Sequence, residues 1–267
     1  MYPWSQEWGE RKRPYAAQLG EVLREASEHG FTVWEQTIAS EAEAQALGAL
    51  LQQYGMTMPS TYAGGILYDE RSAATIENVV TNARYARELG AQVVVINPAP
   101  LSWSEKLDKD DAQLRHQARA LQTLGERLRD EGLILAYHTH DAEMRQSARE
   151  FHHMLRATDP DAVGLCLDGH WIYQGAGHSV VALLDIFNMY RSRVRSVHAR
   201  QSQGDVWTRV FTAEGDVPWQ TLADALKADE FSGPVMLEQA MESRTPRDIP
   251  FAQAQGRGLV NLRELFA

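Results

Sequence analysis

The sequence predicts a single (β/α)₈ TIM barrel, an α/β fold in which eight parallel strands are ringed by helices. Short apolar runs rich in Val, Ile and Leu alternate along the chain with longer amphipathic stretches. Because parallel strands need crossover helices, this alternation indicates a parallel sheet. A doubly wound sheet would normally carry a glycine-rich phosphate turn, and neither GxGxxG nor GxxxxGK[ST] occurs. The 267 residues suit one barrel without a linker, so we expect one domain over residues 1–267.

Seven apolar runs are predicted as strands, and the stretches between them as helices because apolar residues recur there with a period of 3.6. An eighth strand must lie at Met1–Ser5 if the barrel closes. That stretch is short and contains Pro3, so the first strand is expected to be short or truncated. The other predicted strands are Phe31–Glu35, Met56–Ser60, Gln92–Asn97, Leu133–His140, Val163–Asp168, Val194–Ala199 and Val235–Glu238. The predicted helices include Ala16–His29, Glu41–Tyr54, Thr75–Leu89 and Leu114–Asp130.

Charge and cysteine content narrow the choice of partners and compartment. The formal net charge of −10 repels nucleic acid and anionic membrane surfaces, so we expect neither as a partner. Cys166 is the only cysteine, which excludes an intramolecular disulfide and is typical of a reducing compartment. No run approaches the ~18 apolar residues that span a bilayer, and the N-terminal residues lack the apolar core of a signal peptide. We therefore expect a cytoplasmic protein.

Chemically active side chains follow the C-terminal ends of the predicted strands. In a parallel barrel these ends converge on one face, where active sites form. Polar groups that end apolar strands are costly unless they are paired or bind a ligand. Two imidazoles and two carboxylates from adjacent strands would suit one divalent ion such as Zn²⁺, Mn²⁺, Co²⁺ or Fe²⁺. In chain order, the strand ends carry Glu35, then His138, His140 and nearby Glu143, then Asp168 and His170, then His198 and Arg200, and finally Glu238.

Each of these residues also has a structural interpretation. His198 alone would more often be a hydrogen-bonded core histidine than a ligand. Asp168 could cap a helix ahead of a packed His170. Arg200 could pair with Asp205 in the following loop. The joint placement of the polar residues at successive strand ends favours the metal site over these alternatives.

The strand-end segments resemble the xylose isomerase-like TIM barrel superfamily, in its sugar phosphate isomerase/epimerase branch. The resemblance extends from HGFTVWEQ to PVMLEQA, and its most specific pieces are LAYHTHDAEM, VGLCLDGHWIYQGAG and VHARQSQGDVW followed by EGDVPW. It implies one divalent metal at the barrel mouth, with one ligand from each of the last four strands. Histidine replaces the usual glutamate at the first ligand position, so His140 and Glu143 stay as alternatives to His138 there. The implied ligands are His138, Asp168, His198 and Glu238.

The resemblance implies a metal-dependent isomerase or epimerase that acts on a small sugar, keto-sugar or sugar derivative by proton transfer through an enediolate. A keto-inositol-type dehydratase would use the same site. A non-catalytic sugar-binding barrel is another alternative, whereas the net charge disfavours a metal-dependent endonuclease. A small sugar or polyol is the expected partner, and a homo-oligomer is compatible with the sequence. The expected catalytic residues are Glu238 as base, Glu143 or His170 as second acid/base, and Arg200. The expected substrate-binding residues are Glu35, His140, Trp171 and Trp207.

Overall fold

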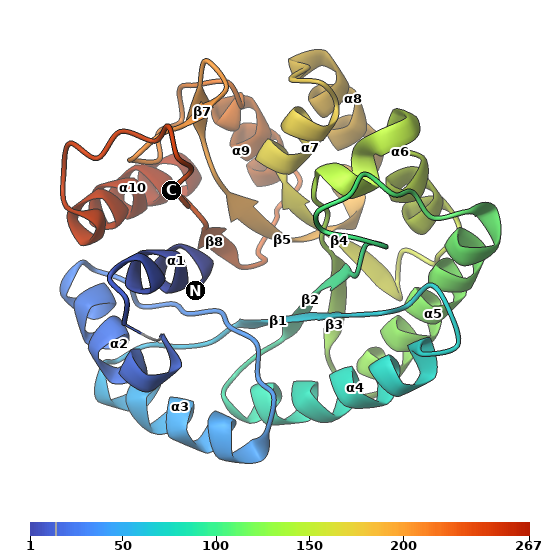
Figure 1. Ribbon diagram of the computed structural model, residues 1–267, viewed down its shortest axis with the longest axis horizontal. Coiled ribbons are helices and arrows are strands. Elements are labelled where there is room, and N and C mark those ends of the chain that lie inside the picture. The colour runs from blue at the N-terminus through green and yellow to red at the C-terminus, as the bar shows by residue number, and fades with distance from the viewer. Residues whose placement is uncertain (14) are drawn as a thin grey trace.

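A curled parallel β-sheet forms the centre of the molecule, and helices surround it (Figure 1). The computed structural model describes residues 1–13 and 15–267. In this part of the chain six strands pair in the order β1-β2-β3-β4-β5-β8, and each pairing is parallel. The six strands are β1 (Ser60–Gly65), β2 (Val93–Pro98), β3 (Ile134–Tyr137), β4 (Val163–Asp168), β5 (Val194–Ala199) and β8 (Val235–Leu237). A separate antiparallel hairpin consists of β6 (Ser202–Gln203) and β7 (Val206–Trp207).

Helices connect the strands and cover the outer face of the sheet, as a parallel barrel requires. Asp110 caps the longest of them and forms a capping box with Gln113. None of the helices in the described part of the chain is both long and apolar enough to span a bilayer. The α-helices are α1 (Tyr2–Glu10), α2 (Leu19–Glu28), α3 (Glu41–Gln53), α4 (Ser72–Glu88), α5 (Asp111–Asp130), α6 (Asp141–Arg156, with non-helical backbone at Arg145–Ala148), α7 (Gly169–Gly175), α8 (Val180–Tyr190), α9 (Trp219–Ala228) and α10 (Phe251–Phe266). Short 3₁₀ turns lie at Ala16–Gln18 and Arg191–Arg193.

The strand predicted at Met1–Ser5 is wrong, because these residues begin helix α1. Pro3 has no backbone N–H to donate to a sheet, and its fixed φ suits the first turn of a helix. Trp4 and Trp8 are four residues apart, so they share one face of the helix, and both are buried. The Trp4 ring packs edge-on against two phenylalanine rings at 5.7 and 5.0 Å. Burial of these tryptophans therefore stabilises a helix where barrel closure alone suggested a strand.

The strand predicted at Phe31–Glu35 is reduced to a single parallel bridge between Val33 and Thr57. The Trp34 N–H donates to the Thr57 carbonyl at 2.8 Å. Residues Phe31–Glu35 and strand β8 line a cavity of about 190 Å³, together with Met1 and Trp4 of the N-terminal segment. The start of α1 therefore lies beside both of these segments, between which a first strand would otherwise pair.

The strand predicted at Met56–Ser60 is displaced along the chain, because β1 begins at Ser60 and ends at Gly65. Gly64 and Gly65 therefore lie in a strand, at its C-terminal end. The predicted strands at Val163–Asp168 and Val194–Ala199 are confirmed at both ends. The first of these is an apolar run and the second is apolar at Val194, Val197 and Ala199, and most residues of both are buried, whereas STYAGG offers few apolar residues.

Alternate residues of the strands face a small core inside the barrel. Because strand side chains alternate with a period of two, His138 and Asp168 share a face with Ala136 and Cys166. This face leads from the barrel interior to its C-terminal mouth. The inner core consists of Val93, Val95, Ala136 and Cys166, with Tyr62 packed against it.

Candidate metal centre

Four side chains converge at the mouth of the barrel, at the C-terminal ends of β3, β4, β5 and β8. One nitrogen or oxygen atom of each lies within 4.8 Å of the corresponding atom of every other. Three are buried, and the fourth, Glu238, has 18% of its side chain exposed. The sheet register places Asp168 directly beside His198. The structure thus brings together the four residues that the resemblance implied as ligands, which are His138, Asp168, His198 and Glu238.

The donor atoms of this cluster fit a divalent cation. Both ring nitrogens of His138 and the Oδ2 atom of Asp168 are buried and have no hydrogen-bond partner among the residues that the structure describes, and His138 Nε2 lies 3.6 Å from Asp168 Oδ2. Leaving a buried polar group unpaired costs about 1–3 kcal/mol. One divalent ion could accept a lone pair from each member, and a set of two imidazoles and two carboxylates is typical of Zn²⁺, Mn²⁺, Co²⁺ or Fe²⁺ sites.

Both carboxylates of the cluster are held in their charged form. Burial opposes ionisation of Glu238, but nearby Arg200 and His198 outweigh it, so the pKa of Glu238 lies below its ordinary value. Burial also opposes ionisation of Asp168, and His138 and Arg200 again lower its pKa. The two negative charges complement a doubly charged cation.

Glu35 holds His198 from one side of the imidazole ring. His198 Nε2 lies 2.9 Å from Glu35 Oε1, while Nδ1 lies 3.2 Å from Glu238 Oε2. The other oxygen of Glu35 accepts a hydrogen bond from Ser60 at the start of β1. A carboxylate next to the second nitrogen of a ligating imidazole fixes its orientation and tautomer. Glu35 is therefore placed to position His198, and it also lines the cavity above the cluster, as expected of a substrate-binding residue.

Arg200 is enclosed between two tryptophans and bonded to Glu238. Its guanidinium carbon lies 4.9 Å from the Trp171 ring centroid and 4.3 Å from that of Trp207, and the residue is 1% exposed. Its Nη2 lies 3.3 Å from Glu238 Oε2, and its Nε donates to the Glu238 carbonyl at 3.0 Å. The alternative pairing with Asp205 is not formed, because that carboxylate accepts a hydrogen bond from a tyrosine hydroxyl instead. Arg200 thus sets the position of the Glu238 carboxylate.

A cavity of about 540 Å³ opens above the cluster. Three of the predicted site residues, His140, Trp171 and Arg200, are among the residues that line it. Trp207 and His170 are not among its lining residues. The full lining comprises Met1, Tyr2, Glu35, Gln36, Thr37, Tyr62, Trp103, His140, Asp141, Trp171, His198, Arg200, Met236, Leu237 and Glu238.

His170 lies behind the cavity wall. Its ring packs edge-on against Trp207 at 5.7 Å, and the residue is 2% exposed. Burial and the nearby Arg200 lower its pKa to about 4, so the imidazole is neutral near pH 7. This placement favours a packing role behind Trp207 over the predicted role as an acid/base.

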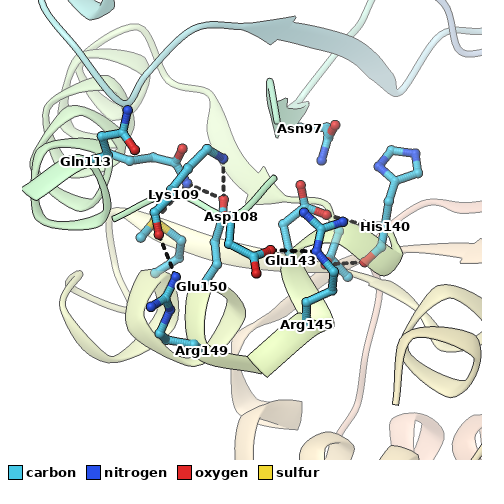
Figure 2. A network of polar contacts seen from close by, with 12 residues as sticks. Asn97, Asp108, Lys109, Gln113, His140, Glu143, Arg145, Arg149 and Glu150 are labelled. Atoms are coloured by element: carbon cyan, nitrogen blue, oxygen red, sulfur yellow. Dashed lines mark hydrogen bonds and ion pairs between the residues drawn. The ribbon is translucent and has the colours of Figure 1, made fainter. Parts of the chain in front are cut away.

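Glu143 lies in the first turn of α6 and bonds to the backbone. Figure 2 shows it beside His140, whose N–H donates to Glu143 Oε2 at 2.7 Å. The same network contains the buried ion pair between Lys109 and Glu150, with an N–O distance of 2.6 Å. Glu143 is fully buried and is not among the residues that line the cavity. Its placement therefore favours a helix-capping role over the predicted roles as acid/base or alternative ligand.

Glu143 should make the stability of the fold depend on pH. Burial, followed by the nearby Glu150, raises its pKa to about 7 from an ordinary value of 4.5. The folded state therefore holds this proton more tightly than the unfolded state, so stability is lost as the pH rises from ~5 to ~8. Glu143→Gln removes the titration, and we expect it to stabilise the protein relative to wild type by on the order of 2–3 kcal/mol more at the higher pH. The free energy of unfolding of both proteins, measured with urea at pH ~5 and at pH ~8, checks this prediction. An equal difference between variant and wild type at the two pH values would contradict it.

Tyr62 and Trp103 are cavity residues that the sequence did not single out as site residues. The Tyr62 ring lies against the rings of His138 and His198, with centroid distances of 5.7 and 6.3 Å. Trp103 packs edge-on against His140 at 5.4 Å. Tyr62 was missed because the strand that carries it was predicted to end at Ser60.

Three known proteins are similar to this chain over most of its length. The inosose dehydratase of Lacticaseibacillus casei is 26% identical over 212 residues, which cover 69% of this chain and 68% of that protein. The fold matches that of a xylose isomerase-like TIM barrel protein of Mycobacterium smegmatis, solved in complex with magnesium, with a TM-score of 0.72, 15% identity and coverage of 94% of this chain and 90% of the other. It also matches the fold of D-psicose 3-epimerase from Clostridium cellulolyticum H10, solved with D-tagatose, with a TM-score of 0.71, 15% identity and coverage of 93% of each chain.

A sequence model of a protein family assigns the chain to a family, in agreement with these similarities. The model of the xylose isomerase-like TIM barrel matches residues 23–260, which includes all six paired strands and the four residues of the cluster. The chain therefore belongs to the xylose isomerase-like TIM barrel family.

Proposed function

We propose that this chain is a divalent-metal-dependent enzyme that isomerises or epimerises a small keto-sugar or polyol derivative. The observation that carries the proposal is the buried cluster of two imidazoles and two carboxylates below a cavity of about 540 Å³. The similarity to an inosose dehydratase and, in fold, to a D-psicose 3-epimerase supports an enzyme of sugar or polyol chemistry. His138, Asp168, His198 and Glu238 would hold the ion.

Glu238 is the proposed base. A bound divalent ion would act as a Lewis acid on the substrate carbonyl and make the adjacent C–H more acidic. Glu238 belongs to the cluster and also lines the cavity, so its carboxylate can reach a substrate there. Its lowered pKa keeps it ionised, and Arg200 holds it through contacts to both its side chain and its carbonyl. Arg200, which also lines the cavity, would offset negative charge that develops on the substrate.

His140 is proposed to bind and orient the substrate from the cavity wall. It lines the cavity, whereas Glu143 and His170 do not. Burial and the neighbouring His138 lower the pKa of His140 to about 3, so near pH 7 its ring is neutral and is suited to hydrogen bonds with substrate hydroxyls rather than to proton transfer. Its ring lies 4.9 Å from that of His138, a member of the cluster.

The walls of the cavity suit a small ring-shaped substrate. Trp103, Trp171 and Tyr62 present aromatic surface, while Gln36 and Glu35 supply polar groups. Aromatic rings pack well against the apolar face of a sugar, and a few convergent polar groups fix its orientation. This combination supports binding of a sugar or polyol.

A dehydratase acting on a keto-inositol-like compound is the second candidate. Of the two carboxylates in the cluster, only Glu238 lines the cavity, and β3 supplies the imidazole of His138 in place of a carboxylate. One carboxylate base suffices for elimination: it takes the proton next to the carbonyl, and the hydroxyl on the following carbon leaves with a proton as water. The 26% identity to an inosose dehydratase favours this alternative.

A screen in deuterated water tests the proposal and separates its two forms. Protein purified without chelator should contain about one divalent ion per chain. Keto-sugars and keto-inositols are then incubated with Mn²⁺-loaded protein and followed by NMR. Deuterium on the carbon next to the carbonyl, with an altered sugar, is expected for isomerisation or epimerisation, whereas loss of water identifies the dehydratase. The exposed Asp224→Asn variant serves as a control. Absence of metal, together with no thermal shift on adding Mn²⁺, Zn²⁺ or Co²⁺, would overturn the proposal.

A further inference from the structure

A thiol lies directly below the proposed metal centre. The Sγ atom of Cys166 and one nitrogen of each of His138 and His198 all lie within 4.8 Å of one another. Cys166 is fully buried, two residues before Asp168 on the same face of β4. The imidazole of His138 is 1% exposed, and neither of its nitrogens has a hydrogen-bond partner among the described residues. Nε2 of His138 lies 3.6 Å from Asp168 Oδ2, so this buried imidazole can serve as a ligand either together with the two carboxylates or together with the thiol.

We propose that Cys166, His138 and His198 form a second metal position, one layer deeper in the barrel, that takes thiophilic divalent ions such as Zn²⁺, Co²⁺ or Cd²⁺. Two imidazoles and one thiolate form a three-ligand set that suits these ions. The thiol proton is released to solvent when the metal binds. The inference rests on the proposed metal centre, because it uses two of the same side chains.

The two positions exclude each other, since they share both histidines. The upper position adds the oxygens of Asp168 and Glu238, which hard ions such as Mn²⁺ prefer. The lower position replaces those oxygens with sulfur. An ion bound to Cys166 would therefore occupy both imidazoles at a point farther from the cavity. A hard ion such as Mn²⁺ would then lie next to the substrate, whereas a thiophilic ion would lie deeper in the barrel, away from the substrate.

Cobalt absorption gives a direct readout of the sulfur ligand. Co²⁺ bound to a thiolate shows a sulfur-to-metal charge-transfer band in the near ultraviolet, and Cys166 is the only cysteine in the chain. We expect this band on titration of the wild-type protein with Co²⁺. Cys166→Ser and Cys166→Ala should both lose it, and Co²⁺ should bind them at least about tenfold more weakly. Asp168→Asn, which removes an oxygen ligand and keeps the thiol, should retain the band.

Binding of Mn²⁺, measured in parallel by calorimetry, separates this inference from the proposed function. Both Cys166 variants should bind Mn²⁺ as the wild type does. A wild-type protein that binds Mn²⁺ and Co²⁺ without the charge-transfer band would overturn the deeper position and leave the upper one intact. The same holds if the band persists in the Cys166 variants. Failure of the wild type to bind either ion would overturn the proposed metal centre itself.

Discussion

Glu238→Gln is expected to remove proton exchange and weaken metal binding together. The amide nearly preserves the shape of the side chain but removes its charge, so the cluster loses one of its two carboxylates and the site loses its proposed base. General base catalysis contributes about 10²–10⁴-fold, and we expect deuterium exchange into the substrate to fall by roughly 10³-fold. Affinity for Mn²⁺ should fall by more than about tenfold, since even groups that only support a ligand have effects of that size.

The loss of the base and the loss of the metal can be separated by adding Mn²⁺. At saturating Mn²⁺ the metal deficit is restored, and the exchange rate should stay low if Glu238 is the base. Glu214→Gln is the matched control, because it makes the same substitution at an exposed carboxylate outside the cavity lining. A Glu238→Gln protein that exchanges the substrate proton at the normal rate would exclude Glu238 as the base. The role would then pass to Glu35, which also lines the cavity.

The strand ends that carry polar side chains could be predicted from the sequence, whereas the choice of His138, Asp168, His198 and Glu238 among those side chains came from the family resemblance. Val163–Asp168 is an apolar run and Val194–Ala199 is a half-apolar one, both are bounded by helical patterns, and each carries one of the four at or near its C-terminal end. Once such strands lie parallel and adjacent, their ends must meet at one face. The pairing of Asp168 with His198 in the sheet is then a consequence of the fold, and no pattern in the sequence indicates that contact directly.

The supporting contacts could not be predicted, because they depend on segments far apart in the chain. Trp171 comes from α7 and Trp207 from the β6–β7 hairpin, and only the folded chain encloses Arg200 between them. Glu143 follows its strand end as closely as a catalytic residue would. Its contact, by contrast, is local, because the carboxylate accepts from the backbone of His140 three residues earlier, and a glutamate at the third position of a helix is the pattern of a capping box.

The N-terminal helix shows a different reason why part of the fold was predicted wrongly from the sequence. The pattern of Trp4 and Trp8, together with Pro3 in the first turn, is compatible with a helix from local preferences alone. A strand at Met1–Ser5 follows only from the requirement that a closed barrel has eight strands, and this requirement conflicts with the helix preference of the residues themselves. The tryptophans lie in a buried aromatic cluster beside β8, so local preference and tertiary packing agree with each other against the ideal barrel.

Arg200→Ala is expected to leave the metal in place and reduce turnover by about 10²-fold or more. A guanidinium has no lone pair to donate, so its removal takes no ligand from the cluster. It does remove the group that holds the Glu238 carboxylate from one side, at 3.3 Å, and the positive charge that faces the cavity. The loss should fall on kcat rather than on the metal content if this charge acts mainly on the transition state. Steady-state kinetics together with elemental analysis measure both quantities.

Two companion variants separate charge from packing. Arg200→Lys keeps the charge but loses the planar group between Trp171 and Trp207, so it should recover only part of the activity. Arg209→Ala removes an arginine that also lies over an aromatic ring, at 5.6 Å from the Phe251 centroid, but outside the cavity lining. It should lower stability without the loss in kcat. Unchanged kinetics in Arg200→Ala on a genuine substrate would assign this arginine a purely structural role, because a residue that offsets charge in the transition state cannot be removed without cost to the rate.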